Sequence, residues 1–133
     1  MILVDANIFM YAAGKESPQR LPCQRFLSRV VDGSATPCCT NAEVLQEVLH
    51  RYRAIGVPAT GFGVFDAVVG LRIPILPIGE DEVRRARRIL ETFPKLSTRD
   101  AVHVGVMEAQ AIKEVLTYDR GFETVTWVRR IEP

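Results

Sequence analysis

The sequence predicts a three-layer α/β/α fold, in which a central, mostly parallel sheet of four to five strands lies between two layers of helices. Short apolar segments alternate along the whole chain with longer segments whose apolar residues recur every three to four positions. This alternation favours parallel strands joined by right-handed helical crossovers, with helices on both faces of the sheet. No repeat, low-complexity segment or linker interrupts the 133 residues, so we expect one domain over residues 1–133.

The N-terminal half contains two strand segments and four helical segments. Residues 1–4 are a continuous apolar run that ends at Asp5, which is the pattern of a buried strand. Pro18 opens a helical segment that ends at Gly33, because proline fits the first helical turn and glycine favours a helix end. The expected elements of this half are strands over residues 1–4 and 35–38 and helices over residues 6–13, 17–33, 40–55 and 58–71.

The C-terminal half continues the alternation. Residues 73–78 form an apolar segment with two prolines, which favour an edge strand because proline cannot donate a ladder hydrogen bond. The other expected elements are helices over residues 80–92 and 98–110 and strands over residues 114–118 and 126–128. Asp119, Arg120 and Gly121 form a turn sequence after the fourth strand.

Composition limits the classes of protein to which the chain can belong. Its hydrophobic share of 47% and charged share of 25% are those of a soluble globular protein. No segment approaches the roughly 20 apolar residues of a membrane helix, and the N-terminal segment lacks the basic region of a signal peptide. We therefore expect a cytoplasmic protein that has no membrane contact and whose cysteines, Cys23, Cys38 and Cys39, are reduced and mostly buried.

The formal net charge of +1 excludes a strong positive field over the whole surface. A nucleic acid would therefore have to be bound by a local patch of Lys and Arg. The densest basic cluster is residues 84–88, which contain four arginines. Acidic residues at helical spacing around this cluster favour a solvated helix face with ion pairs along it.

Three acidic residues are expected at one edge of the sheet. Asp5 follows the first strand and Asp119 follows the fourth, and parallel strands end at the same edge. The helix that begins near residue 98 runs antiparallel to the strand after it, so Asp100 in its first turn lies at that edge too. Crowded carboxylates resist ionising together unless a cation holds them. The chain topology thus predicts a cation site.

Oxygen ligands without Cys or His select a hard ion such as Mg²⁺ or Mn²⁺. Such an ion can orient a water, lower its pKa and neutralise charge on a phosphodiester. Each acid also has a purely structural interpretation, Asp5 as a helix cap, Asp100 as the partner of Ser97 in a capping box and Asp119 as a turn residue. Their convergence at one edge favours the metal site.

The residues by themselves leave the fourth acid open. Glu43 and Glu47 lie four residues apart on one face of the helix expected from residue 40. Glu43 follows Thr40 by three residues, as in a capping box. Glu47 lies about 10 Å along the helix from its start, at about 1.5 Å per residue, so helix geometry alone favours Glu43.

Four segments occur in a fixed order over nearly the whole chain: VDANIFMYA, TNAEVLQEVLHRY, STRDAVHVGVM and LTYDRGFE. In order and spacing they resemble the PIN-domain ribonucleases, and most closely the VapC-type toxins of bacterial and archaeal toxin–antitoxin pairs. The resemblance implies a PIN-like fold and an endoribonuclease that depends on Mg²⁺ or Mn²⁺. It also implies a homodimer and a cognate antitoxin that inhibits the site.

The resemblance assigns four acids to the metal and to catalysis: Asp5, Glu47, Asp100 and Asp119. It thereby favours Glu47 over Glu43. Asn7 and Thr117 match polar positions of the family, where their hydrogen bonds would orient the carboxylates. Asn41 stands where the family more often has Ser.

Two histidines and two arginines accompany these acids. His50 and His103 each follow a candidate ligand by three residues, and both are interpreted as core histidines rather than as general bases. Arg99 and Arg120 each flank a candidate ligand and are predicted to bind RNA phosphate.

Two other functions are alternatives to the nuclease. A phosphoacceptor signalling domain also carries acids at the carboxyl edge of a parallel sheet, but it needs a pair of acids before its central strand and a lysine after its last, and the chain has neither. A non-catalytic PIN-fold module would bind RNA or protein without cutting, and the presence of all four acids favours the nuclease over it.

Overall fold

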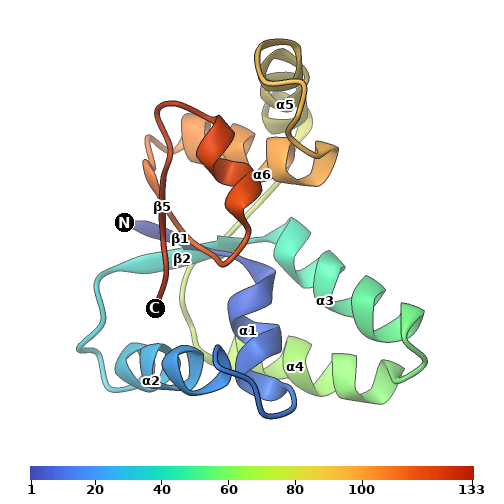
Figure 1. The fold of residues 1–133 in the computed structure, drawn as a ribbon, viewed down its shortest axis with the longest axis vertical. Helices are drawn as coiled ribbons and strands as arrows, with labels where there is room; N and C mark the ends of the chain where they lie inside the picture. The colour runs from blue at the N-terminus through green and yellow to red at the C-terminus, as the bar shows by residue number, and fades with distance from the viewer.

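The computed structural model describes residues 1–133 and contains a five-stranded sheet between two layers of helices (Figure 1). The strands are β1 (Ile2–Val4), β2 (Cys38–Asn41), β3 (Ile75–Leu76), β4 (Glu114–Leu116) and β5 (Arg129–Ile131). Their order across the sheet is β3-β2-β1-β4-β5, and every neighbouring pair is parallel. The prediction of a three-layer α/β/α fold is confirmed.

The two faces of the sheet are covered by different helices (Figure 1). One layer consists of α1 (Ala6–Ala13), α2 (Arg20–Val31), α3 (Ala42–Ala54) and α4 (Pro58–Gly70). The other consists of α5 (Glu80–Thr92), α6 (Thr98–Ala109) and the short 3-10 helix η1 (Arg120–Thr124). In β1, Ile2 and Val4 belong to the first core and Leu3 to the second, because successive side chains of a strand point to opposite faces.

The strand order reverses at β1, since β2 and β3 lie on one side of it and β4 and β5 on the other. In sheets of this kind, ligands collect at the carboxyl ends of the strands beside such a reversal. Asp5 is the first residue after β1, and Thr117 is the first residue after β4. The backbone N–H of Asp5 donates to Leu116 O at 3.1 Å, so the two strand ends remain side by side up to the site.

Strand β2 lies three residues beyond its predicted position at residues 35–38. It includes Thr40, whose side chain is fully buried and whose Oγ1 donates to Val4 O at 2.9 Å. The strand was predicted from apolar runs, and Thr40 is polar. The prediction therefore missed this residue, whose hydroxyl is hydrogen-bonded inside the sheet.

Strand β5 is also displaced, from the predicted residues 126–128 to Arg129–Ile131. Arg129 pairs with Glu114, and Arg130 donates to Thr117 O at 3.1 Å. These charged residues belong to an edge strand, where their side chains find partners on β4 and beyond its end. The prediction that β3 is the other edge strand is confirmed.

Helix α3 begins at Ala42, two residues later than predicted. Asn41 is its N-cap, because Asn41 Oδ1 accepts a hydrogen bond from Val44 N at 3.2 Å. The predicted capping box of Thr40 and Glu43 is therefore wrong. Helix α2 likewise begins at Arg20 rather than at residue 17.

The surface and the thiols follow the prediction. The arginines of α5 pair with acids on α5 and α6, namely Glu80, Asp81, Glu91 and Glu108. The three cysteines are free and buried. None of the helices combines the length and the apolar character that crossing a membrane would require.

Candidate metal centre

Asp5 is the most buried acid at the sheet edge, with 6% of its surface exposed. Its Oδ1 accepts from Ala6 N at 2.7 Å, and its Oδ2 accepts from Asn7 Nδ2 at 2.9 Å and from Thr117 Oγ1 at 2.6 Å. Burial raises the pKa of Asp5, against the lowering effects of His103 and of the Thr117 hydrogen bond. Three donors fix the orientation of this carboxylate, which both caps α1 and faces the site.

Asn7 and Thr117 connect the ends of β1 and β4. Asn7 Nδ2 donates to Thr117 Oγ1 at 2.8 Å as well as to Asp5, and Asn7 Oδ1 accepts from Tyr118 N at 3.3 Å. Thr117 Oγ1 also accepts from Asp119 N at 2.9 Å. The same two side chains therefore orient Asp5 directly, and they also hold the backbone of Tyr118 and Asp119, Asn7 at Tyr118 and Thr117 at Asp119.

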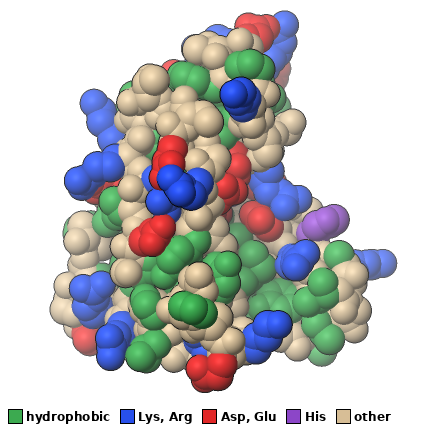
Figure 2. Space-filling view, in the orientation of Figure 1, with side chains coloured by type: hydrophobic (Ala, Val, Ile, Leu, Met, Phe, Trp, Pro, Cys, Tyr) green, Lys and Arg blue, Asp and Glu red, His purple; other side chains and the backbone are tan.

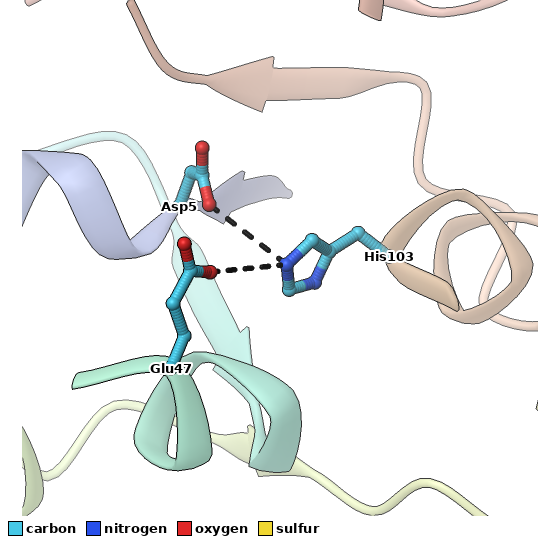
Figure 3. Close-up of side chains that lie close together, drawn as sticks. All are labelled: Asp5, Glu47 and His103. Atoms are coloured by element: carbon cyan, nitrogen blue, oxygen red, sulfur yellow. Dashed lines mark ion pairs between the residues drawn. The ribbon is translucent and has the colours of Figure 1, made fainter. Parts of the chain in front are cut away.

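Glu47 reaches the site from the second turn of α3. Its Oε2 lies 3.8 Å from His103 Nε2, and Asp5 Oδ1 lies 3.9 Å from the same nitrogen. Figure 3 shows both carboxylates pointing toward the imidazole, and the possible ligand atoms of the three residues all lie within 4.8 Å of one another. Glu43 is outside this group and pairs with Arg99 at 3.2 Å. The structure therefore brings Glu47, rather than Glu43, beside Asp5, contrary to the geometric preference for Glu43.

Arg99 is the counter-ion of Glu47, with 3.4 Å between Arg99 Nη1 and Glu47 Oε1. Burial raises the pKa of Glu47, but the nearby His103 and the charge of Arg99 outweigh it and lower that pKa overall. Glu47 is therefore ionised at neutral pH and offers a charged oxygen ligand.

Asp100 and Asp119 border the solvent side of the site. A Cβ placed on Gly121 would lie 3.1 Å from Asp119 Oδ1 and 3.5 Å from Asp100 Oδ2, so both carboxylates approach the same glycine. Ser97 Oγ accepts from Asp100 N at 3.1 Å, which fixes the first turn of α6. Burial and the charges of Asp119 and Asp5 raise the pKa of Asp100 to about 6. Burial is the larger cause, and repulsion from Asp119 and Asp5 adds to it.

The donor set fits a hard divalent cation. Oxygen atoms predominate, and two of the carboxylates have raised pKa values that a cation would reverse. The acids range from the buried Asp5 to the exposed Asp119, so the site opens to solvent on one side. Figure 2 shows acidic side chains gathered in the middle of this face, between the two helical layers.

The two histidines lie in different environments, and so do the two arginines that were predicted to bind RNA. His103 is buried as predicted, but its Nε2 has no hydrogen-bond partner, so it is not the satisfied core histidine that its helix position indicated. His50 is exposed, and its interpretation as a core residue is wrong. Arg99 lies in the site, whereas Arg120 is 80% exposed at its side chain and pairs with Glu123.

A model of the PIN domain matches residues 2–128 of the chain. The chain belongs to the PIN-domain family. Among its PIN-domain relatives, ribonuclease VapC13 of Mycobacterium tuberculosis is 40% identical over 131 residues, which are 98% of this chain and 99% of that protein. Ribonuclease VapC23 of the same species is 32% identical over 119 residues, which are 90% of this chain and 93% of that protein.

Two solved structures show the same PIN-domain fold. Mycobacterium tuberculosis VapC20, described as a sarcin-ricin loop cleaving toxin, superposes with a TM-score of 0.80 at 17% identity and covers 100% of both chains. A toxin–antitoxin complex from Klebsiella pneumoniae superposes with a TM-score of 0.69 at 15% identity and covers 97% of this chain and 96% of that chain. The resemblance seen in the four sequence segments is confirmed.

Proposed function

We propose that this PIN-domain protein is a metal-dependent endoribonuclease and the toxin of a type II toxin–antitoxin system. In this proposal Asp5, Glu47, Asp100 and Asp119 hold Mg²⁺ or Mn²⁺. The observations that carry it are that Asp5 lies beside Glu47, that Asp100 and Asp119 approach the same glycine, and that Asp100 is close enough to Asp5 for the charge of Asp5 to raise its pKa. Relatives named ribonucleases, at 40% and 32% identity over almost their whole length, support RNA as the substrate.

A bound divalent ion would orient a water, lower its pKa and neutralise charge on the phosphodiester. Asp5, held by Asn7 and Thr117, provides a rigid oxygen at the base of the site, and the exposed Asp119 lies where substrate and water enter. The attacking water displaces the 3′ oxygen in line, so the products carry a 5′-phosphate and a 3′-hydroxyl. No covalent enzyme intermediate forms.

The test compares the wild-type protein with Asp5→Asn on structured RNAs in the presence of Mn²⁺. The wild type is expected to cleave RNA, and chelation of the metal or the Asp5→Asn substitution is expected to abolish cleavage, because asparagine lacks the charge that the metal needs. Asparagine keeps one oxygen for capping Ala6 N, so the start of α1 is retained. Equal cleavage by both proteins would reveal a contaminating nuclease, and binding of RNA by the wild type without cleavage would support the non-catalytic module instead.

Arg99 is expected to bind an RNA phosphate beside the metal. Arg99→Ala should weaken RNA binding by about 10- to 150-fold, as expected for the loss of one charge-assisted contact of about 1.5–3 kcal/mol. Metal affinity should be retained because Arg99 competes with the cation for Glu47. RNA binding is measured with the inactive Asp5→Asn protein as background. Unchanged RNA affinity in the double variant would remove Arg99 from the RNA site.

An apolar groove in the helical layer that contains α1 supports an antitoxin partner. The groove has a volume of about 470 Å³ and lies between α1, α2 and α4. Eight of its ten lining residues are hydrophobic, among them Phe9, Leu27, Val64 and Val68. Such a groove suits the apolar face of an amphipathic helix. The structure from Klebsiella pneumoniae that shares this fold is a toxin–antitoxin complex, which supports an antitoxin as the partner.

Ala67→Glu tests the groove without touching the acids. Ala67 is exposed and lines the groove, so a buried glutamate there should weaken antitoxin binding by at least about 10-fold, given the cost of an unpaired charge. RNA cleavage should be unchanged. The partner is the product of the short reading frame expected beside the gene, and Val83→Glu, an equally polar change at an exposed site on α5, is the control. Tight binding by Ala67→Glu would place the antitoxin elsewhere.

The proposal includes a homodimer. Exposed apolar side chains at the junction of α3 and α4, namely Ile55, Val57 and Phe62, provide apolar surface outside the groove. Surfaces of this kind mark protein contacts when they are contiguous.

A further inference from the structure

His103 lies beneath Asp5 and Glu47 with its two ring nitrogens in different environments. Nδ1 is 2.9 Å from Asn41 Nδ2. Nε2 is buried, has no hydrogen-bond partner and faces the two carboxylates at 3.8 and 3.9 Å (Figure 3). His103 is only 1% exposed, so bulk water does not reach Nε2 to supply the missing hydrogen bond.

The orientation of the Asn41 amide determines which nitrogen carries the ring proton. Asn41 Oδ1 accepts from Val44 N at 3.2 Å, and the N-terminus of α3 presents only donors. Asn41 Nδ2 must therefore face His103, and an amide nitrogen only donates. His103 Nδ1 accepts this hydrogen bond and has no proton, so the proton of the neutral ring is on Nε2.

We propose that His103 is a positioning residue that donates its Nε2 proton to Asp5 and Glu47, and that Asn41 fixes the tautomer that permits this. The inference rests on the proposed metal site. His103 is then not a metal ligand, although its Nε2 lies close to Asp5 and Glu47, because the nitrogen that faces the site has a proton in place of a free lone pair.

Burial lowers the pKa of His103, but without a cation the neighbouring carboxylates favour the charged ring and raise that pKa overall. With the cation bound, the neutral ring would be a donor that offsets the repulsion between the two carboxylates without adding a positive charge. Glu47 is only half-buried, so a shift of about 1 Å would bring its Oε2 into hydrogen-bond range of Nε2. The carboxylate oxygens that face the opening remain available as ligands. Phe122, whose ring centroid is 6.4 Å from that of His103, limits the movement of the imidazole on its other side.

Nitrogen NMR of the histidine rings tests the tautomer directly. The chain has two histidines, and substitution of the exposed His50 by Asn assigns the signals. At mildly alkaline pH, His103 is expected to show a bare Nδ1 and a protonated Nε2, before and after addition of Mg²⁺. A proton on Nδ1 would overturn the assigned tautomer and the proposal with it. Loss of the Nε2 proton when Mg²⁺ is added would overturn the proposal by making His103 a ligand.

Asn41→Ser tests the role of Asn41 in the same experiment. Serine also caps helices well, so α3 keeps its start, but its shorter side chain cannot reach Nδ1. The variant is expected to show both tautomers of His103. An unchanged spectrum would contradict the assignment of Asn41.

Metal affinity separates a positioning role from simple packing. His103→Leu fills the space without a donor and is expected to lower Mn²⁺ affinity by about 10–100-fold, the usual effect of losing a partner of a metal ligand. His103→Gln places an amide donor near the position of Nε2 and is expected to bind Mn²⁺ within about 3-fold of the wild type, well short of that loss. Calorimetry measures the affinities, and thermal unfolding verifies that both variants fold.

Equal Mn²⁺ affinity in a folded His103→Leu protein would contradict the proposal. This experiment uses no RNA. A wrong nuclease assignment would instead be seen as a wild-type protein that binds Mn²⁺ but does not cleave RNA. The tautomer measurement on the wild-type ring tests His103 even if His103→Leu does not fold.

Discussion

Glu47→Gln is expected to lower metal-dependent RNA cleavage by more than about 100-fold, because the loss of a residue that only supports a metal ligand already costs roughly 10–100-fold. Glu43→Gln should lower cleavage by less than about 10-fold, because Glu43 is neither a proposed ligand nor a partner of one. Glu47 Oε2 lies 3.8 Å from His103 Nε2, in the cluster that contains Asp5, and Glu43 does not belong to that cluster. Glutamine keeps the size of the side chain but lacks the charge that the cation requires. The measurement is the initial rate of RNA cleavage at saturating Mn²⁺.

The two substitutions form a matched pair. Each is isosteric, each lies on α3, and each removes one ion pair with Arg99, at 3.2 Å for Glu43 and 3.4 Å for Glu47. Changes in the charge of Arg99 therefore affect both variants, and their difference reports the metal site. A greater loss of activity in Glu43→Gln than in Glu47→Gln would make Glu43 the fourth ligand.

The fold could be predicted wherever burial of apolar side chains determines the structure. Strands β1 and β4 consist mainly of buried apolar residues and were predicted within two residues of their observed ends. Strands β2 and β5 were displaced because polar residues within them are satisfied by specific partners. Thr40 donates to Val4 O and Arg130 donates to Thr117 O, and neither partner is visible in a local pattern.

The candidate site could be predicted in part for a similar reason. Asp5, Asp100 and Asp119 follow from strand and helix direction, which fix where an element begins and ends. The place of Glu47 depends on where α3 starts, and the Asn41 cap determines that start. The environment of His103 depends on Asn41 as well, at a separation of 62 residues in the chain, so neither could be derived from local spacing.

Gly105→Ala is expected to destabilise the protein by about 1–3 kcal/mol, the usual cost of overpacking a close contact, although alanine is the better helix former. A Cβ on Gly105 would lie 2.5 Å from Glu82 O and 3.2 Å from Ala86 N. Both atoms belong to the backbone of α5, so α5 and α6 would have to move apart. Because α6 carries Asp100 and His103, we also expect weaker Mn²⁺ binding.

Gly63→Ala is the control that separates the clash from helix propensity. Gly63 is also inside a helix, α4, but nothing lies within 4 Å of the position its Cβ would take. There the gain in helix propensity should act alone and stabilise the protein by up to about 1 kcal/mol. Denaturant unfolding monitored by circular dichroism gives both free energies of unfolding. The two substitutions are expected to change the free energy of unfolding in opposite directions, because only Gly105 lies close to neighbouring backbone. A stabilised Gly105→Ala protein would contradict the close approach of α5 and α6, on which the position of His103 depends.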